Sequence, residues 1–246
     1  MGRCGCLQVH GVDDVDRYLG KVLQAAAKAH ACICGHNGDP LDLLRKMKFD
    51  EIGCHPIDGH ALNLIEQVNQ TWTYIAALLA ARCLLDRHPE AEGFRLAPGA
   101  DAVTALDIMS EVTGLVGAET FAAVDPANNR KLDNDLKKLA TRPEQHRYVF
   151  FMSPRYPGTG RIKKLERDGV QVWSVDFAKG DFSPMDQKNR AEQDCGLEKG
   201  AVPPNELSQE DPEKIRRFKD RVRQAIELGT VKRFPTPRTR DCDPSK

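Results

Sequence analysis

Between residues 61 and 177 the chain alternates between helical and strand-like hydrophobic patterns, and this order constrains the fold most strongly. From Ala61 to Asp86 apolar residues recur at steps of three and four, which predicts a long helix. Three short apolar runs follow and predict strands: GFRLA, AVTALDIMS and GLVGAETFAAV. Gly114 begins the third run, so the last two strands are expected to form a hairpin that turns there.

The pattern then returns to a helix. Asp125 and Pro126 are typical of a helix start, with Asp as cap and Pro in the first turn. RYVFFMSP is wholly apolar and predicts a central strand, GTGRIKKLERDG predicts a short helix that ends at Gly169, and VQVWSVDF predicts a fifth strand. We expect a three-layer α/β domain with a mixed central sheet of about five strands.

Residues 1–60 are weakly patterned and are interpreted as an N-terminal leader. Val15 to Ala29 predicts a short helix, and CICG is interpreted as a strand. DPLDLLRKM predicts a helix capped by its aspartate, and GCHPIDGH predicts a loop.

The composition changes after Phe177. Residues 178–210 are polar and contain Pro and Gly, which predicts a linker. Residues 211–246 are expected to form a basic helix and tail. The predicted organisation is therefore a leader, an α/β core at 61–177, a linker and a C-terminal extension.

Global charge provides no attraction for nucleic acid, because 36 Lys and Arg balance 36 Asp and Glu. DNA binding would therefore need a local basic patch. The longest apolar run, YIAALLAARCLL, is too short to span a bilayer. The N-terminus becomes acidic before any signal-like apolar stretch develops. We expect a cytoplasmic protein with reduced thiols and no membrane partner.

Two acids interrupt the predicted hairpin. Asp107 lies seven residues before Gly114 and Glu119 five residues after it, so the two could meet across the strands. An acid in an apolar strand must be solvated, protonated, paired or bound to a cation. Two adjacent carboxylates suit Mg²⁺, or Mn²⁺ in its place. The alternative is that either acid faces solvent.

Glu66 lies in the long predicted helix and begins a polar stripe with Asn69, Gln70 and Thr73. The helix is otherwise apolar and should be well covered. A polar stripe on such a helix indicates a site, although an ordinary solvated face would give the same pattern.

With these residues in this order, the segment from Ala61 to Phe177 resembles the PD-(D/E)xK nuclease superfamily, which has the restriction-endonuclease-like fold. In that family a helix with a glutamate precedes a hairpin that carries an aspartate and then an acid-x-lysine. Glu66, Asp107 and Glu119 match these three acids in turn. The resemblance implies catalysis by the three acids, with the metal bound by Asp107 and Glu119.

The chain departs from the family at two positions. Leu106 replaces the proline before the aspartate, and Phe121 replaces the motif lysine. Because related enzymes can carry the basic residue on the following helix, Lys131 is the candidate substitute. Nearby basic residues are candidate phosphate contacts: Arg130, Lys137 and Lys138.

The resemblance implies metal-dependent hydrolysis of DNA phosphodiesters, or nucleic-acid binding by a nuclease-like fold. The alternative is a catalytically inactive protein of the same fold that acts as a binding or scaffold subunit. Phe121 favours that alternative. A homodimer or larger assembly is compatible with either, since many relatives dimerise to cut both strands.

Cysteines and histidines suggest two further metal sites. Two C-x-C pairs could hold zinc: Cys4 with Cys6, and Cys32 with Cys34. Zinc fingers more often use C-x2-C spacing, and the ordinary explanation of the second pair is small buried residues in a strand. His55 and His60 in HPIDGH could also bind a metal, although such a segment is more often a plain loop.

Overall fold

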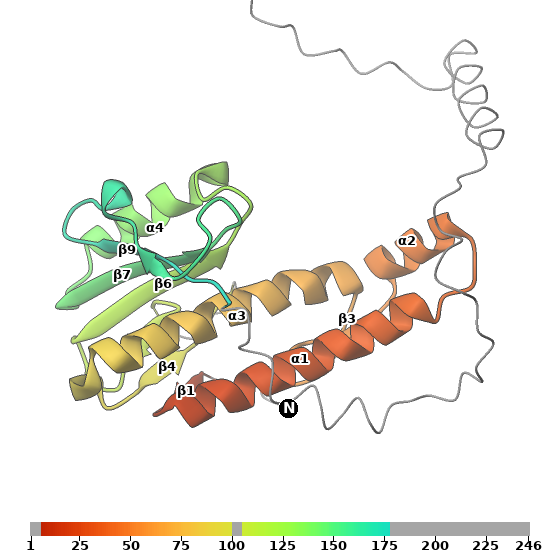
Figure 1. Cartoon of the computed structure of the whole chain (residues 1–246), viewed down its shortest axis with the longest axis horizontal. Helices are drawn as coiled ribbons and strands as arrows, with labels where there is room; N and C mark the ends of the chain where they lie inside the picture. The colour runs from red at the N-terminus through yellow and green to blue at the C-terminus, as the bar shows by residue number, and fades with distance from the viewer. Residues whose placement is uncertain (1–5, 100–104, 178–246) are drawn as a thin grey trace, which may run out of the picture. The chain divides into compact units, whose positions relative to one another are not determined.

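A mixed seven-stranded sheet organises the computed structural model, which describes residues 6–99 and 105–177 (Figure 1). The strands, in their order across the sheet, are β1 (Leu7–Val9), β4 (Phe94–Leu96), β5 (Ile108–Ser110), β6 (Val116–Ala122), β7 (His146–Met152), β9 (Gln171–Ser174) and β8 (Gly160–Arg161). β6, β7 and β9 are parallel, and the other neighbours are antiparallel. All described residues belong to one compact unit.

Within the described residues, four α-helices accompany this sheet: α1 (Val12–Cys34), α2 (Pro40–Phe49), α3 (Leu64–Arg87) and α4 (Lys131–Ala140). A small hairpin of β2 (Gly53–Cys54) and β3 (Ala61–Leu62) joins α2 to α3. The same part of the chain contains three single 3₁₀ turns, at Pro89–Ala91, Asn128–Arg130 and Lys163–Leu165.

The core has two parts because side chains alternate between the faces of β6 and β7. Ala118 and Phe150 belong to a cluster that also contains apolar residues of α1 and α3. Phe121 and Phe151 belong to a second cluster with the leucines of α4. α3 and α4 therefore pack against opposite faces of these strands, as Figure 1 shows.

The mixed α/β class, the long helix and the hairpin were predicted and are confirmed. The sheet has seven strands where about five were expected, because β1 and β8 also join it. β1 pairs with β4, and α1 lies along α3, so residues 7–34 share the sheet and the core with the later segments (Figure 1). The predicted linker at 178–210 and helix at 211–246 lie outside the described residues.

The prediction of a strand at CICG was wrong, because α1 continues to Cys34. Buried Val15, Leu19 and Val22 keep the helical period. The alanine-rich stretch that follows has high helix propensity, and the helix ends only at Gly35. The second helix was predicted correctly: Asp39 Oδ1 accepts a 2.8 Å hydrogen bond from Leu41 N.

The predicted helix start at Asp125 was also wrong. Asp125 caps only a turn, accepting a 3.0 Å hydrogen bond from Ala127 N. Asn129 and Arg130 then adopt left-handed φ angles of 52° and 55°, which a continuous right-handed helix excludes. α4 therefore begins at Lys131.

The helix predicted to end at Gly169 is absent. Gly160 and Arg161 pair with β9 instead, and Ile162 N donates a 2.7 Å hydrogen bond to Val172 O. The segment has too few apolar residues to bury a helical face, so pairing with the sheet satisfies its backbone better.

Candidate functional site

Asp107 and Glu119 face each other across the β5–β6 hairpin. Ile108 pairs with Ala118 and Met109 with Gly117, so one further step in this antiparallel register sets Asp107 opposite Glu119. Asp107 itself lies immediately before β5, where the ladder has just ended. The structure thus brings together the two acids that the sequence placed on either side of Gly114.

Asp107 is buried, and its environment makes its negative charge unfavourable. Its Oδ2 accepts hydrogen bonds from Thr120 N at 2.8 Å and from Thr120 Oγ1 at 3.1 Å. Burial, with the charge of Glu119 as the next cause, nevertheless raises the pKa of Asp107 to about 6. Any cation that approached this carboxyl would relieve both effects.

Two lysines of α4 form salt bridges with buried acids. Lys138 Nζ lies 2.6 Å from Glu119 Oε1, and Lys131 Nζ lies 2.7 Å from Asp135 Oδ1. Burial opposes the charge of Lys131, but the hydrogen bond to Asp135 and the nearby acids outweigh it and raise the pKa of Lys131. Both lysines are about half exposed, whereas the acids they contact are buried. We call Asp107, Glu119, Asp135, Lys131 and Lys138 the acid–lysine cluster.

Asp135 was not predicted as a site residue. It lies three residues after Leu132 and four before Leu139, on the stripe that α4 buries. That spacing could have identified Asp135 from the sequence, because an acid on the buried side of a helix needs a partner of opposite charge or a hydrogen-bond donor. Its Oδ2 is buried without a hydrogen-bond partner, and burial raises its pKa despite Lys131.

Phe121 occupies the position of the expected motif lysine and packs as a core residue. Its ring stacks on Phe151 with centroids 5.8 Å apart. Lys131 Nζ lies 6.0 Å from the centroid of the Phe121 ring. The ammonium group of Lys131 therefore lies near Phe121, the position at which a lysine was expected.

The cluster offers the ligand chemistry that Mg²⁺ or Mn²⁺ requires. The hydrogen bonds described above use Oδ2 of Asp107 and Oε1 of Glu119, and Asp135 Oδ2 is buried without a hydrogen-bond partner. Hard divalent cations take one or two carboxylates and complete their shell with water or phosphate. Asp107 and Glu119 therefore offer oxygen ligands of the type that a magnesium-like ion takes, whereas the two acids do not form a group of three ligand atoms within 4.8 Å together with Asp135.

Glu66 lies elsewhere, in the first turn of α3. Its backbone N donates to the capping Asn63 Oδ1 at 2.8 Å, and its Oε1 accepts from Gln70 Nε2 at 3.1 Å. Within the described segments its hydrogen bonds stay in this helix and do not reach Asp107 or Glu119.

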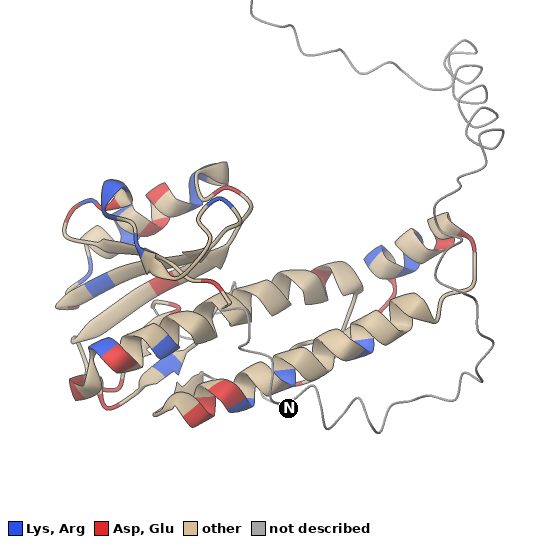
Figure 2. Cartoon of the chain, viewed as in Figure 1, with Lys and Arg blue, Asp and Glu red and all other residues tan. Residues whose placement is uncertain are grey.

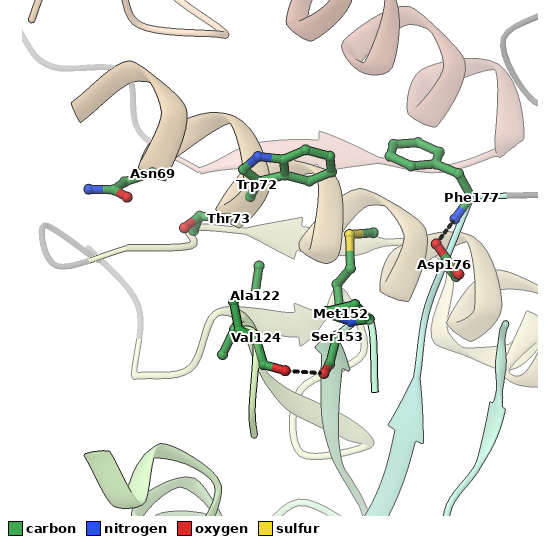
Figure 3. A pocket seen from close by; sticks show the side chains of 11 residues that line it. Asn69, Trp72, Thr73, Ala122, Val124, Met152, Ser153, Asp176 and Phe177 are labelled. Atoms are coloured by element: carbon green, nitrogen blue, oxygen red, sulfur yellow. Dashed lines mark hydrogen bonds between the residues drawn. The ribbon is translucent and has the colours of Figure 1, made fainter. Parts of the chain in front are cut away.

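Part of the predicted polar stripe lines a cavity of about 710 Å³ (Figure 3). Asn69, Trp72 and Thr73 of α3 face it, and the ends of β6, β7 and β9 form the other walls. Ligands of open α/β sheets commonly bind at the carboxyl ends of parallel strands. Trp72 and Phe177 meet edge to face, with centroids 6.5 Å apart. The sequence indicated Asn69 and Thr73 but not the two aromatic residues.

Two of the predicted phosphate contacts lie on the exposed side of α4. Arg130 and Lys137 both bind Asp133, at 3.0 and 2.9 Å. Lys138, the third, contacts Glu119 instead. In Figure 2 acidic and basic segments are interspersed on α4 and the neighbouring loops.

The cysteines predicted to bind zinc do not converge. Cys6 precedes β1, near the start of α1, whereas Cys32 and Cys34 lie in the last turns of this 23-residue helix. A helix of that length spans roughly 35 Å. Cys34 Sγ instead lies 3.4 Å from His30 Nε2, and Cys4 lies outside the described residues.

No known family, curated protein or solved structure matches this chain. None of the helices among the described residues is long and apolar enough to cross a bilayer.

Proposed function

We propose that this protein is a metal-dependent phosphodiesterase that acts on DNA, built on a three-layer, restriction-endonuclease-like domain. One observation carries the proposal: two buried carboxylates, Asp107 and Glu119, are close enough for the charge of Glu119 to raise the pKa of Asp107. Two ionised carboxylates this close repel each other, and a cation bound between them would remove the repulsion.

Each residue of the cluster has a role in this proposal. Asp107 and Glu119 hold the metal, which would supply an activated water and stabilise the leaving oxygen. Lys131 stays protonated because its pKa is raised, so it acts by electrostatic stabilisation and water orientation and not as a base. Asp135 fixes the ammonium group of Lys131 through the 2.7 Å salt bridge.

A second candidate is a nuclease-like protein without catalysis that serves as a binding or scaffold subunit. The packing of Phe121 on Phe151 and the salt bridge from Lys138 to Glu119 favour it. In this case the lysines alone neutralise the acids, and no metal is needed. A DNA partner and a homodimer remain predictions under either candidate.

The deciding experiment incubates the full chain with plasmid DNA and single-stranded DNA in Mg²⁺, Mn²⁺ or EDTA. We expect metal-dependent cleavage that Glu119→Gln reduces at least about 100-fold, since it removes a metal ligand and its charge. Asp133→Asn is the matched control, because Asp133 is an acid of the same region that pairs at the surface of α4. Metal binding without cleavage, or neither, would favour the second candidate.

A further inference from the structure

Three metal-binding side chains meet in the loop between β2 and β3, outside the acid–lysine cluster. His55 Nδ1 lies 3.1 Å from Asp58 Oδ1, and His60 Nδ1 lies 2.6 Å from the same oxygen. The three atoms all lie within 4.8 Å of one another. The two imidazole rings are stacked, with centroids 4.7 Å apart.

The backbone of the loop fixes this arrangement. β2 and β3 close the hairpin, and His55 N donates a 2.7 Å hydrogen bond to His60 O. His60 N donates to Asp58 Oδ1 at 3.2 Å, and Gly59 provides the positive φ of 77° that the tight turn requires. The two histidines are thus held on adjacent sides of one carboxylate before any ion binds.

His55 is further held from α3, where Tyr74 packs edge to face against its ring at 5.2 Å. Ile57 N and Asp58 N both point at His55 Nδ1 from 3.4 Å, which places the lone pair of this nitrogen inside the loop. The side of this nitrogen that accepts hydrogen bonds therefore lies 3.1 Å from a carboxylate oxygen, an arrangement that a cation between them would stabilise.

We propose that His55, Asp58 and His60 bind one divalent transition-metal ion of the Zn²⁺ type. Two imidazoles and one carboxylate suit such an ion, whereas Mg²⁺ prefers oxygen ligands. Zn–N and Zn–O bonds of about 2.0–2.2 Å set tetrahedral ligands roughly 3.4 Å apart. The His55–Asp58 distance of 3.1 Å needs almost no change, and the His60–Asp58 distance of 2.6 Å must increase by less than about 1 Å. His60 is 56% exposed and can make that movement.

Three protein ligands leave a fourth position for water or for a donor from another molecule. The ion would also replace the hydrogen bond between Asp58 and His60 with a link between both ends of the 53–62 hairpin. We therefore expect the ion to stabilise the fold as well as to present an open coordination site.

A second group, His88, Glu90 and His146, also lies within ligand distance but is committed to hydrogen bonds. His88 Nδ1 pairs with Glu90 Oε1 at 2.9 Å, and its Nε2 pairs with Tyr148 Oη at 2.7 Å. Binding there would break a buried hydrogen bond, whereas His55 loses only two long contacts at 3.4 Å.

The test is calorimetric titration of the EDTA-treated full chain with ZnCl₂ and, separately, MgCl₂, together with Co²⁺ absorption spectra. We expect the zinc affinity to fall at least about tenfold in His60→Ala and in Asp58→Asn. Both side chains are partly exposed, so both variants should fold. His10→Ala controls for loss of a surface histidine, and Glu119→Gln controls for the proposed magnesium site.

Cysteines provide the competing explanation, so the double variant Cys32→Ser/Cys34→Ser is included. Zinc binding that survives in the double variant and in Glu119→Gln, but weakens in His60→Ala, supports the site. No zinc binding by the wild type, or binding lost only with the cysteines, overturns it. Loss of Mg²⁺ binding in Glu119→Gln concerns only the proposed nuclease site, so the two proposals can fail separately.

Discussion

Lys138 of α4 places its ammonium group 2.6 Å from Glu119 Oε1, in the middle of β6. The next residue towards the N-terminus, Lys137, reaches Asp133 at 2.9 Å on the exposed side of the same helix. One helix thus offers two adjacent lysines, one bound to a buried acid and one to a partly exposed acid. Comparing them separates the requirements of the buried site from general surface electrostatics.

Lys138→Met is expected to destabilise the fold by about 1–3 kcal/mol, because it leaves the buried carboxylate of Glu119 without its cation. Lys137→Met should cost less than about 0.5 kcal/mol, as is usual for an exposed pair. Urea denaturation at pH 7.5 measures both. Adding Glu119→Gln to Lys138→Met should restore much of the loss, since the two residues are coupled. Equal effects of the two lysines would show that the buried salt bridge contributes nothing particular.

Asp107 predicts an unusual dependence of stability on pH. Its pKa rises from an ordinary 3.8 to about 6 in the folded state. The folded state therefore binds the proton more tightly, and its stability falls as the pH rises from about 4 through 6. Asp107→Asn removes this charge, so at pH 8 the variant should be more stable than the wild type by up to about 3 kcal/mol.

Near pH 4 the difference between the two proteins should be small, because Asp107 is then protonated in the folded state and the unfolded state is close to its ordinary pKa of 3.8. Denaturation curves at pH 4, 6 and 8 provide the measurement. Asp133→Asn is the control: hydrogen bonds from Lys137 and Arg130 lower the pKa of Asp133, so its loss should destabilise the fold at pH 8. An Asp107→Asn variant that is less stable at pH 8 would contradict the assigned environment.

A divalent cation should counteract the cost of the Asp107 charge. We expect millimolar Mg²⁺ or Mn²⁺ to raise the melting temperature of the wild type at pH 8, and to have a smaller effect at pH 5, where protons compete for the carboxyl. The shift should vanish in Asp107→Asn. Thermal melts with Mg²⁺ and with EDTA are sufficient, and an identical shift in the variant would place the ion elsewhere.

Gly117 of β6 is expected to be sensitive to an added side chain. A Cβ there would lie 2.5 Å from Leu106 Cδ1 and 3.0 Å from Glu144 Cγ. Gly117→Ala should therefore cost about 1–3 kcal/mol by overpacking, and it would displace the residue that precedes Asp107. Gly160→Ala in β8 is the matched control, because nothing lies within 4 Å of its Cβ position. Denaturation midpoints that move equally would contradict this expectation.

The sequence determined those elements whose signals are local and repeated. The long helix carries more than five turns of apolar residues, and the apolar run of β7 has no room for an exposed face. The turn near Gly114 predicted that Asp107 and Glu119 lie close across the hairpin, whereas the register that sets them opposite each other came from the structure. The helix, the strand and the hairpin depend on neighbours in the chain, so the pattern was enough to predict them.

Only the tertiary structure decided how distant segments combine. β1 pairs with β4 and α1 packs along α3, although these segments are far apart in the chain. Gly160 and Arg161 pair with β9 because β9 offered a free strand edge. The acid–lysine cluster also depends on such packing. α4 packs on β6, which brings Lys138 to Glu119 and buries Asp135, and Phe121 is part of the core between them. Long-range packing and desolvation set these contacts, and no local hydrophobic period encodes them.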